Sequence, residues 1–103
     1  MTEIITLCGS TKFKKEFEEV ERKLTLEGKI VLSVGIFNHT DNEQLTPEQM
    51  EMLDEVSLRK IDLSNSIYVI DVDKYIGEST KKDIEYATKM GKTIYYYSKE
   101  EQS

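Results

Sequence analysis

Two short apolar runs place the strongest constraint on the fold of this chain. Residues 4–7 and 66–70 are rich in isoleucine and other apolar residues and lack the polar alternation of a strand with one face in water. We therefore predict strands buried on both faces, as in parallel sheets whose faces are covered by helices. Residues 29–36 and 92–97 are predicted to form two further strands.

Helical periodicity fills the first gap between these strands. Apolar residues recur there at spacings of four, three and four, at Phe13, Phe17, Val20 and Leu24. This spacing places the four side chains on one face of a helix. The glycine at Gly28 is a natural end for that helix.

Residues 46–63 begin with the start signal of a second helix. Thr46 supplies an N-cap hydroxyl, Pro47 suits the first helical position, and Gln49 completes a capping box. A third helix is predicted over residues 80–90, where apolar positions again recur at helical spacing.

The predicted elements alternate between strand and helix from end to end. This order indicates a parallel sheet with right-handed crossovers and helices on both faces. We expect an α/β protein, a small flavodoxin-like three-layer sandwich with a four- to five-stranded parallel sheet. With 103 residues the chain suffices for a single domain, predicted over residues 1–97. Residues 98–103 are predicted to be a polar tail that frays.

Composition excludes several classes of protein. The single cysteine, Cys8, permits no internal disulfide, and with His39 as the only histidine we expect no metal site and no cofactor. A formal net charge of -6 argues against general nucleic-acid binding. The sequence has no apolar run long enough to cross a membrane and no signal-peptide pattern at its start, so a cytoplasmic protein without membrane association is expected.

Two segments are open to more than one interpretation. The loop at 37–45 is long and polar for so small a domain, which is typical either of a functional lid or of disorder. The predicted helix at 46–63 has apolar residues on two sides. One side would pack on the sheet, and the other would be covered either by a second copy, giving a homodimer, or by a neighbouring part of the chain.

Two turns of similar composition follow the first and third predicted strands. Gly9 permits a tight turn and close approach of a ligand, while Ser10 and Thr11 place hydroxyl and amide donors at a helix start. Gly77 precedes a second pair of hydroxyls, on Ser79 and Thr80. Ligands of parallel α/β sheets bind at the carboxyl ends of the strands, so we expect both turns to face one anion-binding cleft. The spacing of a Walker loop is absent, and for Ser10 a simple helix cap remains the alternative.

Asp83 is the candidate reactive group. Helical phase places it about 40° from Ala87, on the core side of the third predicted helix, so that it should point toward the rim of the cleft. A capping role with Thr80 is the structural alternative. Glu85 should face outward or toward a partner subunit. A phosphoacceptor domain of the chemotaxis-receiver kind is disfavoured because Cys8-Gly9-Ser10 stands where such a domain needs an acidic pair.

Four segments in this order resemble the nucleoside 2-deoxyribosyltransferase-like family, which includes 2'-deoxynucleoside 5'-monophosphate N-glycosidases. They read ITLCGSTKF, GKIVLSVGIF, IDLSNSIYVIDV and GESTKKDIEYATKMGKTIYYY, and together they cover nearly the whole chain. The resemblance implies a flavodoxin-like fold, a homodimer with sites near the subunit interface, and a Gly-Ser turn that helps to hold the nucleotide.

The family resemblance also implies a reaction. A glutamate at the start of the helix after the third main strand attacks the anomeric carbon of the sugar and displaces the base. The matching position here is Asp83, which keeps the charge but is shorter by one methylene. The family's second acid has no clear match, because Asp54 and Asp62 are offset and Ser57 occupies the most natural alignment.

On this basis we expect cleavage or transfer of the N-glycosidic bond of a 2'-deoxynucleoside or its 5'-monophosphate, with Asp83 as nucleophile. The alternative is a module that binds a nucleotide-derived ligand without turning it over. The expected substrate-binding residues are Gly9, Ser10, Thr11, Lys12, Phe13, His39, Gly77, Ser79 and Thr80.

Overall fold

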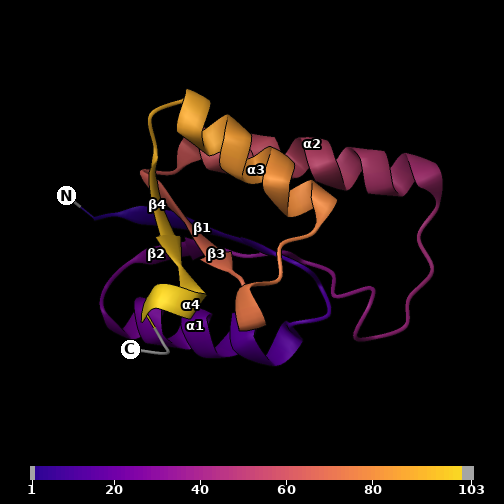
Figure 1. The fold of residues 1–103 in the computed structure, drawn as a ribbon, viewed down its shortest axis with the longest axis horizontal. Coiled ribbons are helices and arrows are strands. Elements are labelled where there is room, and N and C mark those ends of the chain that lie inside the picture. The colour runs from indigo at the N-terminus through magenta and orange to yellow at the C-terminus, as the bar shows by residue number, and fades with distance from the viewer. Residues whose placement is uncertain (1, 101–103) are drawn as a thin grey trace.

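The structure is a computed structural model that describes residues 2–100. Strands and helices alternate along the chain (Figure 1). Their bounds are β1 (Ile4–Gly9), α1 (Lys14–Leu26), β2 (Ile30–Leu32), α2 (Pro47–Leu63), β3 (Ser66–Ile70), a 3-10 turn η1 (Val72–Lys74), α3 (Glu78–Lys89), β4 (Thr93–Tyr96) and α4 (Tyr97–Glu100).

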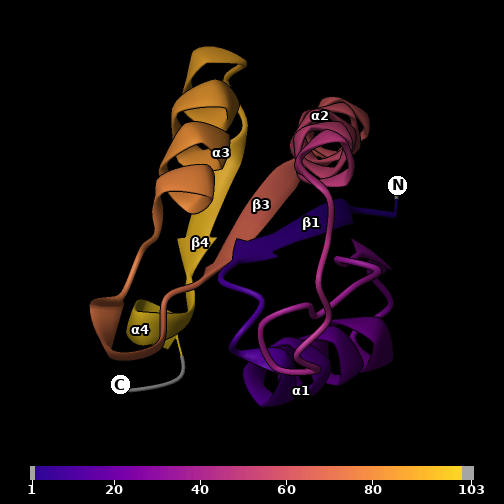
Figure 2. The ribbon, with the colours of Figure 1, turned by 90° about the vertical axis from the view of Figure 1, so that its right-hand side faces the viewer.

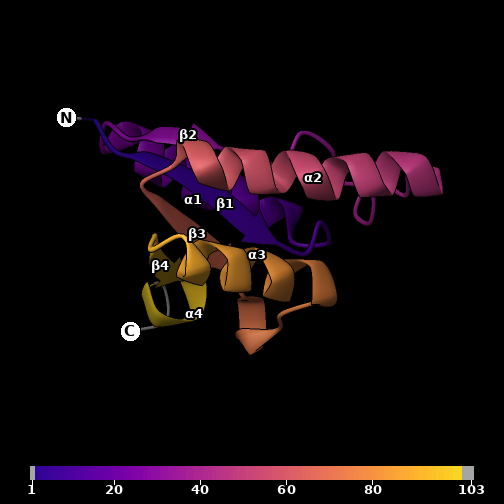
Figure 3. The ribbon, with the colours of Figure 1, turned by 90° about the horizontal axis from the view of Figure 1, so that it is seen from above.

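The four strands form one parallel sheet in the order β2-β1-β3-β4. Helices α2 and α3 cover one face, and α1 covers the other together with the short α4 (Figure 2). Viewed from above, α2 and α3 run side by side over the sheet (Figure 3). The α/β class and the small flavodoxin-like three-layer sandwich expected from the sequence are confirmed, with four strands in the sheet.

Each central strand supplies side chains to both layers of helices. On β1, Ile5 and Leu7 pack in the cluster beneath α1, whereas Cys8 joins the cluster beneath α2 and α3. On β3, Tyr68 faces α1 and Ile67 faces α2 and α3. This explains the apolar runs without alternation, because strands covered on both sides need apolar residues at every position.

Helix α2 begins as its sequence predicts. The Thr46 hydroxyl accepts from the backbone N–H of Gln49 at 3.1 Å, and the Gln49 side chain accepts from the N–H of Thr46 at 2.9 Å. Leu58 and Ile61 pack toward the sheet, whereas Met52 and Leu63 are exposed. Within residues 2–100, no helix combines the length and the apolar character that a membrane crossing requires.

Several element boundaries differ from the sequence prediction. Strand β2 is only Ile30–Leu32, since the chain leaves the sheet before Ser33. Helix α3 starts at Glu78 with Gly77 as N-cap, so Thr80 lies inside the first turn rather than before it. Helix α1 likewise starts at Lys14, beyond Ser10. Neither pair of hydroxyls occupies a capping position, because Ser10 and Thr11 precede α1 whereas Ser79 and Thr80 lie within the first turn of α3.

The polar end of the chain is better ordered than predicted. Asp71, which follows β3, is buried and accepts hydrogen bonds from the Ser98 backbone N–H at 2.8 Å and from the Ser98 hydroxyl at 2.7 Å. These two bonds anchor the first turn of α4. The expected fraying tail is therefore wrong for residues 98–100, and residues 101–103 lie outside the described part of the chain.

The loop at 37–45 is held against the start of α1. Lys14 pairs with Asp41 at 3.0 Å, and the Thr40 hydroxyl donates to the carbonyl of Thr11 at 2.8 Å. The ring of Phe37 packs edge-on against the ring of Phe17 with 5.4 Å between centroids. Between the two interpretations of this loop, the contacts favour an ordered cover over disorder.

Close packing at the end of β1 generates a stability prediction. A Cβ added at Gly9 would lie 2.9 Å from the carbonyl oxygen of Ile70 and 3.3 Å from the ring of Phe17. Gly9→Ala should therefore lower the free energy of unfolding by about 1–3 kcal/mol, as overpacked cores do. Urea denaturation measures the change. Gly35→Ala is the control, because nothing lies within 4 Å of its added Cβ, and an equal loss in both variants would contradict the packing argument.

Candidate functional site

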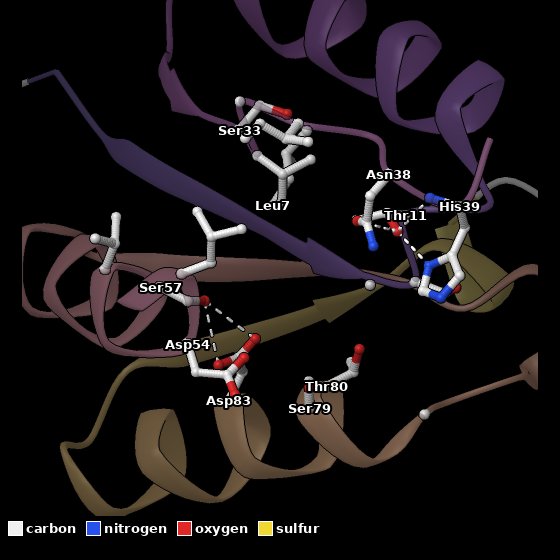
Figure 4. A pocket seen from close by; sticks show the side chains of 18 of the residues that line it. Leu7, Thr11, Ser33, Asn38, His39, Asp54, Ser57, Ser79, Thr80 and Asp83 are labelled. Carbon is white, nitrogen blue, oxygen red and sulfur yellow. Dashed lines mark hydrogen bonds between the residues drawn. The ribbon is translucent and has the colours of Figure 1, made fainter. Parts of the chain in front are cut away.

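One cavity lies at the carboxyl end of β1, between α2, α3 and the loop after β2. Its volume is about 290 Å³. Figure 4 shows side chains from the β1 turn, from α2 and from α3 converging on this space. The two glycine turns therefore meet at one hollow, as their place after parallel neighbouring strands predicts.

Most of the residues that the sequence indicates line this cavity. They are Gly9, Ser10, Thr11, His39, Gly77, Ser79, Thr80 and Asp83. Lys12 and Phe13 do not line it. The Lys12 ammonium lies 3.7 Å from the ring centroid of Tyr75, and Phe13 packs against the core beneath α1. Lys12 therefore contacts Tyr75, which lines the cavity, but does not line the cavity itself.

Asp83 lies in the second turn of α3 and faces α2 across the cavity. The hydroxyl of Ser57 is 3.2 Å from each carboxylate oxygen of Asp83 (Figure 4). The thiol of Cys8 is buried, and it lies close enough to Asp83 for each group to affect the pKa of the other. The carboxylate is thus held by Ser57 of α2, and a capping bond with Thr80 is not part of its environment.

Burial is the largest influence on the pKa of Asp83 and raises it from 3.8 to about 6. The hydrogen bond from Ser57 works against this rise, and the negative charge of Asp54 adds to it. For the Cys8 thiol, burial is again the largest cause of a pKa raised well above its usual range, and the neighbouring charge of Asp83 adds to the rise. Cys8 therefore stays protonated and is not a thiolate nucleophile.

The two alternative acids of α2 have different positions. Asp54 lines the cavity beside Asp83. Asp62 lies outside it, where it accepts from the Tyr86 hydroxyl at 2.5 Å and pairs with Arg59 at 3.0 Å. Asp54 is therefore the only one of the two that can contact a ligand in this space.

Thr11 connects the cavity to the loop at 37–45. Its hydroxyl donates to the side-chain oxygen of Asn38 at 3.0 Å and lies 2.5 Å from Nδ1 of His39 (Figure 4). Because a hydroxyl has one proton, Nδ1 of His39 must donate to Thr11 when Thr11 donates to Asn38. In the neutral imidazole the other ring nitrogen of His39 is then an acceptor, available to a ligand.

The start of α3 provides donors at the outer end of the cavity. Gly77, the N-cap, has no side chain to cap the helix, so the N–H groups of the first turn keep their hydrogen-bonding capacity. The hydroxyls of Ser79 and Thr80 and the positive end of the helix dipole lie at the same place. This combination suits a phosphate or another small anion.

Sequence reasoning missed several residues that line the cavity. These are Ser33 and Asn38 after β2, Tyr75 before α3, and Met50, Leu53, Val56 and Lys60 on α2. Helical spacing could have placed Lys60 on the cavity side of α2, since Lys60 follows Ser57 by three residues and so shares its side of the helix. Within residues 2–100, no group of three or more histidine, cysteine, aspartate or glutamate side chains is arranged to hold a metal ion.

Comparisons with protein-family models, with curated proteins and with solved structures found no match for this chain. Its resemblance to a known family stays a prediction, and its chemistry has to be inferred from the cavity.

The raised pKa of Asp83 generates a prediction about stability. The folded state binds the proton more tightly than the unfolded state, so stability is lost as pH rises from about 4 to about 6. Asp83→Asn should raise the free energy of unfolding by about 1–3 kcal/mol near neutral pH, and by much less below pH ~4. Urea denaturation at both pH values measures this difference.

Glu85→Gln provides the matched control for that comparison, because Glu85 is an exposed acid on the same helix. It should change stability by less than about 0.5 kcal/mol at either pH. If Asp83→Asn raised the free energy of unfolding by the same amount at both pH values, the raised pKa of Asp83 would be contradicted, because the cost should arise only when the carboxyl is ionised.

Proposed function

We propose that the chain binds a 2'-deoxynucleoside or its 5'-monophosphate in this cavity and breaks the N-glycosidic bond, with Asp83 as the nucleophile. The observation that carries the proposal is the position of Asp83: a partly buried carboxylate, held by Ser57, that faces a cavity with anion-binding groups at its outer end. The family resemblance of the sequence supports the same reaction.

The proposed chemistry has two steps. A carboxylate oxygen of Asp83 forms an ester bond with the anomeric carbon while the bond from that carbon to the base nitrogen breaks. The base keeps the electron pair and takes up a proton. Water, or a second base in a transfer reaction, then attacks the anomeric carbon and releases the carboxylate, as in retaining glycosidases.

The electrostatics of Asp83 suit a nucleophile near neutral pH. With a pKa of about 6, the group is mostly ionised at pH 7 and yet more basic than an ordinary aspartate. The hydrogen bond from Ser57 orients both oxygens and restrains the rotation of the side chain. Preorganisation of this kind reduces the entropy that must be lost to reach the reactive geometry.

The outer end of the cavity suits the 5'-phosphate. Ser79 and Thr80 contribute hydroxyls beside the free N–H groups of α3, and Ser10 and Thr11 face them from the β1 turn. Thr80 precedes Asp83 by one helical turn, about 4.5 Å along the axis. This separation allows a deoxyribose to extend from a phosphate at the helix start to a carboxylate inside the cavity.

We also propose a homodimer formed through α2. The part of α2 nearest its N-terminus extends past the edge of the sheet (Figure 1). Met50, Met52 and Val56 are exposed there, with 42%, 58% and 38% of their surfaces accessible. Met50 and Val56 also line the cavity, so a second copy packed on this stretch would complete its wall.

A binding module without turnover is the second candidate. The observation in its favour is that the Ser57 hydroxyl shares its proton between both oxygens of Asp83 and so competes with attack on a sugar. The shorter reach of aspartate acts in the same direction, because a displacement of about 1 Å can cost on the order of 100-fold in rate.

Release of free base tests the enzymatic proposal. Wild-type protein incubated with deoxynucleosides and deoxynucleotides should release base, detected by chromatography, and Asp83→Ala should lower the rate by at least about 1,000-fold. The wild-type rate should rise with pH through about 6 and then level off, as Asp83 ionises.

Glu85→Gln, on the outer side of α3, should keep wild-type activity in this assay. Equal rates for wild type and Asp83→Ala would overturn the assignment of the nucleophile. If ligands raise the melting temperature but no base is released, the binding module is the correct function.

Sedimentation tests the dimer. The wild-type chain should sediment at twice its monomer mass, and Met52→Glu should weaken association by roughly 100-fold, because a carboxylate buried without a partner costs several kcal/mol. Met90→Glu is the control, since Met90 is similarly exposed, at 48%, but lies at the end of α3. A monomeric wild type, or equal weakening in both variants, would contradict the proposed interface.

A further inference from the structure

Lys60 is a positively charged group inside the cavity without a carboxylate partner. It is the only lysine or arginine among the described residues that line this space. Its ammonium donates to the backbone carbonyl of Ser33 at 2.7 Å, and within residues 2–100 it forms no ion pair. An ammonium has three N–H groups, so two of them remain available to a ligand.

Ser33, which holds Lys60, has an unsatisfied group of its own. Its hydroxyl oxygen is buried and has no hydrogen-bond partner among the described residues. A buried hydroxyl without a partner destabilises the folded state, and this cost is recovered if a ligand supplies the missing bond. No partner fixes its rotamer, so rotation about one bond can turn it toward the cavity that Ser33 lines.

These two residues lie at the inner end of the cavity. Ser33 directly follows Leu32, the last residue of β2, which is paired with Thr6 of β1. From Thr6, β1 continues three residues further to Gly9, about 10 Å, before the turn that carries Ser10. The carbonyl of Lys60 accepts from the hydroxyl of Thr6 at 3.1 Å, which fixes this part of α2 at the same inner level.

Asp83 lies between the inner and the outer ends. It contacts Ser57, one helical turn before Lys60, and it follows Thr80 of the outer end by one turn. In a nucleotide, the base and the 5'-phosphate extend from the sugar in different directions. With the anomeric carbon at Asp83 and the phosphate at the first turn of α3, the base extends toward Lys60.

Charge also disfavours a phosphate at the inner end. Asp54 and Asp83 line the same cavity as Lys60, and a phosphate at the inner end would add negative charge to a space that already holds two carboxylates. A neutral acceptor avoids this repulsion. Lysine is a donor only, so its neutral partner must be an oxygen or nitrogen with a free lone pair.

We propose that Lys60 is a specificity-determining residue that donates a hydrogen bond to a carbonyl oxygen of the base, so that the cavity prefers bases with an oxo group. This inference rests on the proposed function, because it takes the ligand to be a nucleotide with its sugar at Asp83. Hypoxanthine, guanine, cytosine, uracil and thymine carry such an oxygen. Adenine has acceptor ring nitrogens but no oxo group, and at the position where hypoxanthine has its oxygen it carries an amino group, which is a donor like the ammonium of Lys60.

The test measures binding in the Asp83→Asn background, in which the ligand is not consumed. Calorimetry compares 2'-deoxyinosine and 2'-deoxyuridine 5'-monophosphates with 2'-deoxyadenosine 5'-monophosphate and with 2-deoxyribose 5-phosphate, which has no base. Lys60→Met should weaken binding of the two oxo-base nucleotides by about 10- to 100-fold, the usual effect of a hydrogen bond to a charged group. Binding of the adenine nucleotide and of the sugar phosphate should change less than about threefold.

Two matched variants keep the result interpretable. Lys89→Met removes an exposed lysine from α3 and should leave all four affinities unchanged. Lys60→Arg keeps a charged donor and should retain most of the preference for oxo bases. This variant therefore distinguishes the loss of the hydrogen-bond donor from a general structural effect of substitution in α2. Thermal melts establish that each variant is folded.

Each other outcome overturns the inference in a distinguishable way. An equal loss for the sugar phosphate and the nucleotides would assign Lys60 to the phosphate. Unchanged affinities in Lys60→Met would remove it from recognition while leaving nucleotide binding intact. If none of the four ligands binds even the parent variant, the proposed function itself fails.

Discussion

The parallel pairing of β1 with β3 is the constraint on which the candidate site depends. It brings the carboxyl ends of both strands to one edge of the sheet, so that the turns at Gly9 and Gly77 open on one cavity. Helices α2 and α3 then run back over the same face, which places Ser57 and Asp83 opposite each other. The sheet topology therefore determines where the site lies, and the individual side chains determine its chemistry.

The position of Asp83 illustrates how stability and chemistry oppose each other. Burial makes the charged form of Asp83 costly and raises its pKa to about 6, while the hydrogen bonds from Ser57 recover part of that cost. In the proposed reaction this cost is relieved, because the carboxylate becomes a neutral ester and the departing base takes the electron pair. A carboxylate with a pKa raised by burial at the wall of a cavity is typical of functional positions.

Local patterns in the sequence predicted the local features well. The capping box at Thr46, the buried strands and the inward phase of Asp83 all depend on residues close together in the chain. The bond from Ser98 to Asp71 and the tether from Lys60 to Ser33 join residues 27 positions apart, and no periodicity encodes them. Helical phase placed Asp83, whereas Lys60 was missed because only apolar residues of that helix were assigned to faces.

The single hydroxyl proton of Thr11 has a consequence for ligand entry. That proton now fastens the loop through Asn38, and the same hydroxyl faces the cavity. A ligand that accepts a hydrogen bond from the Thr11 hydroxyl must replace Asn38 as the acceptor. Ligand binding and this attachment of the 37–45 loop therefore compete for the same hydroxyl proton.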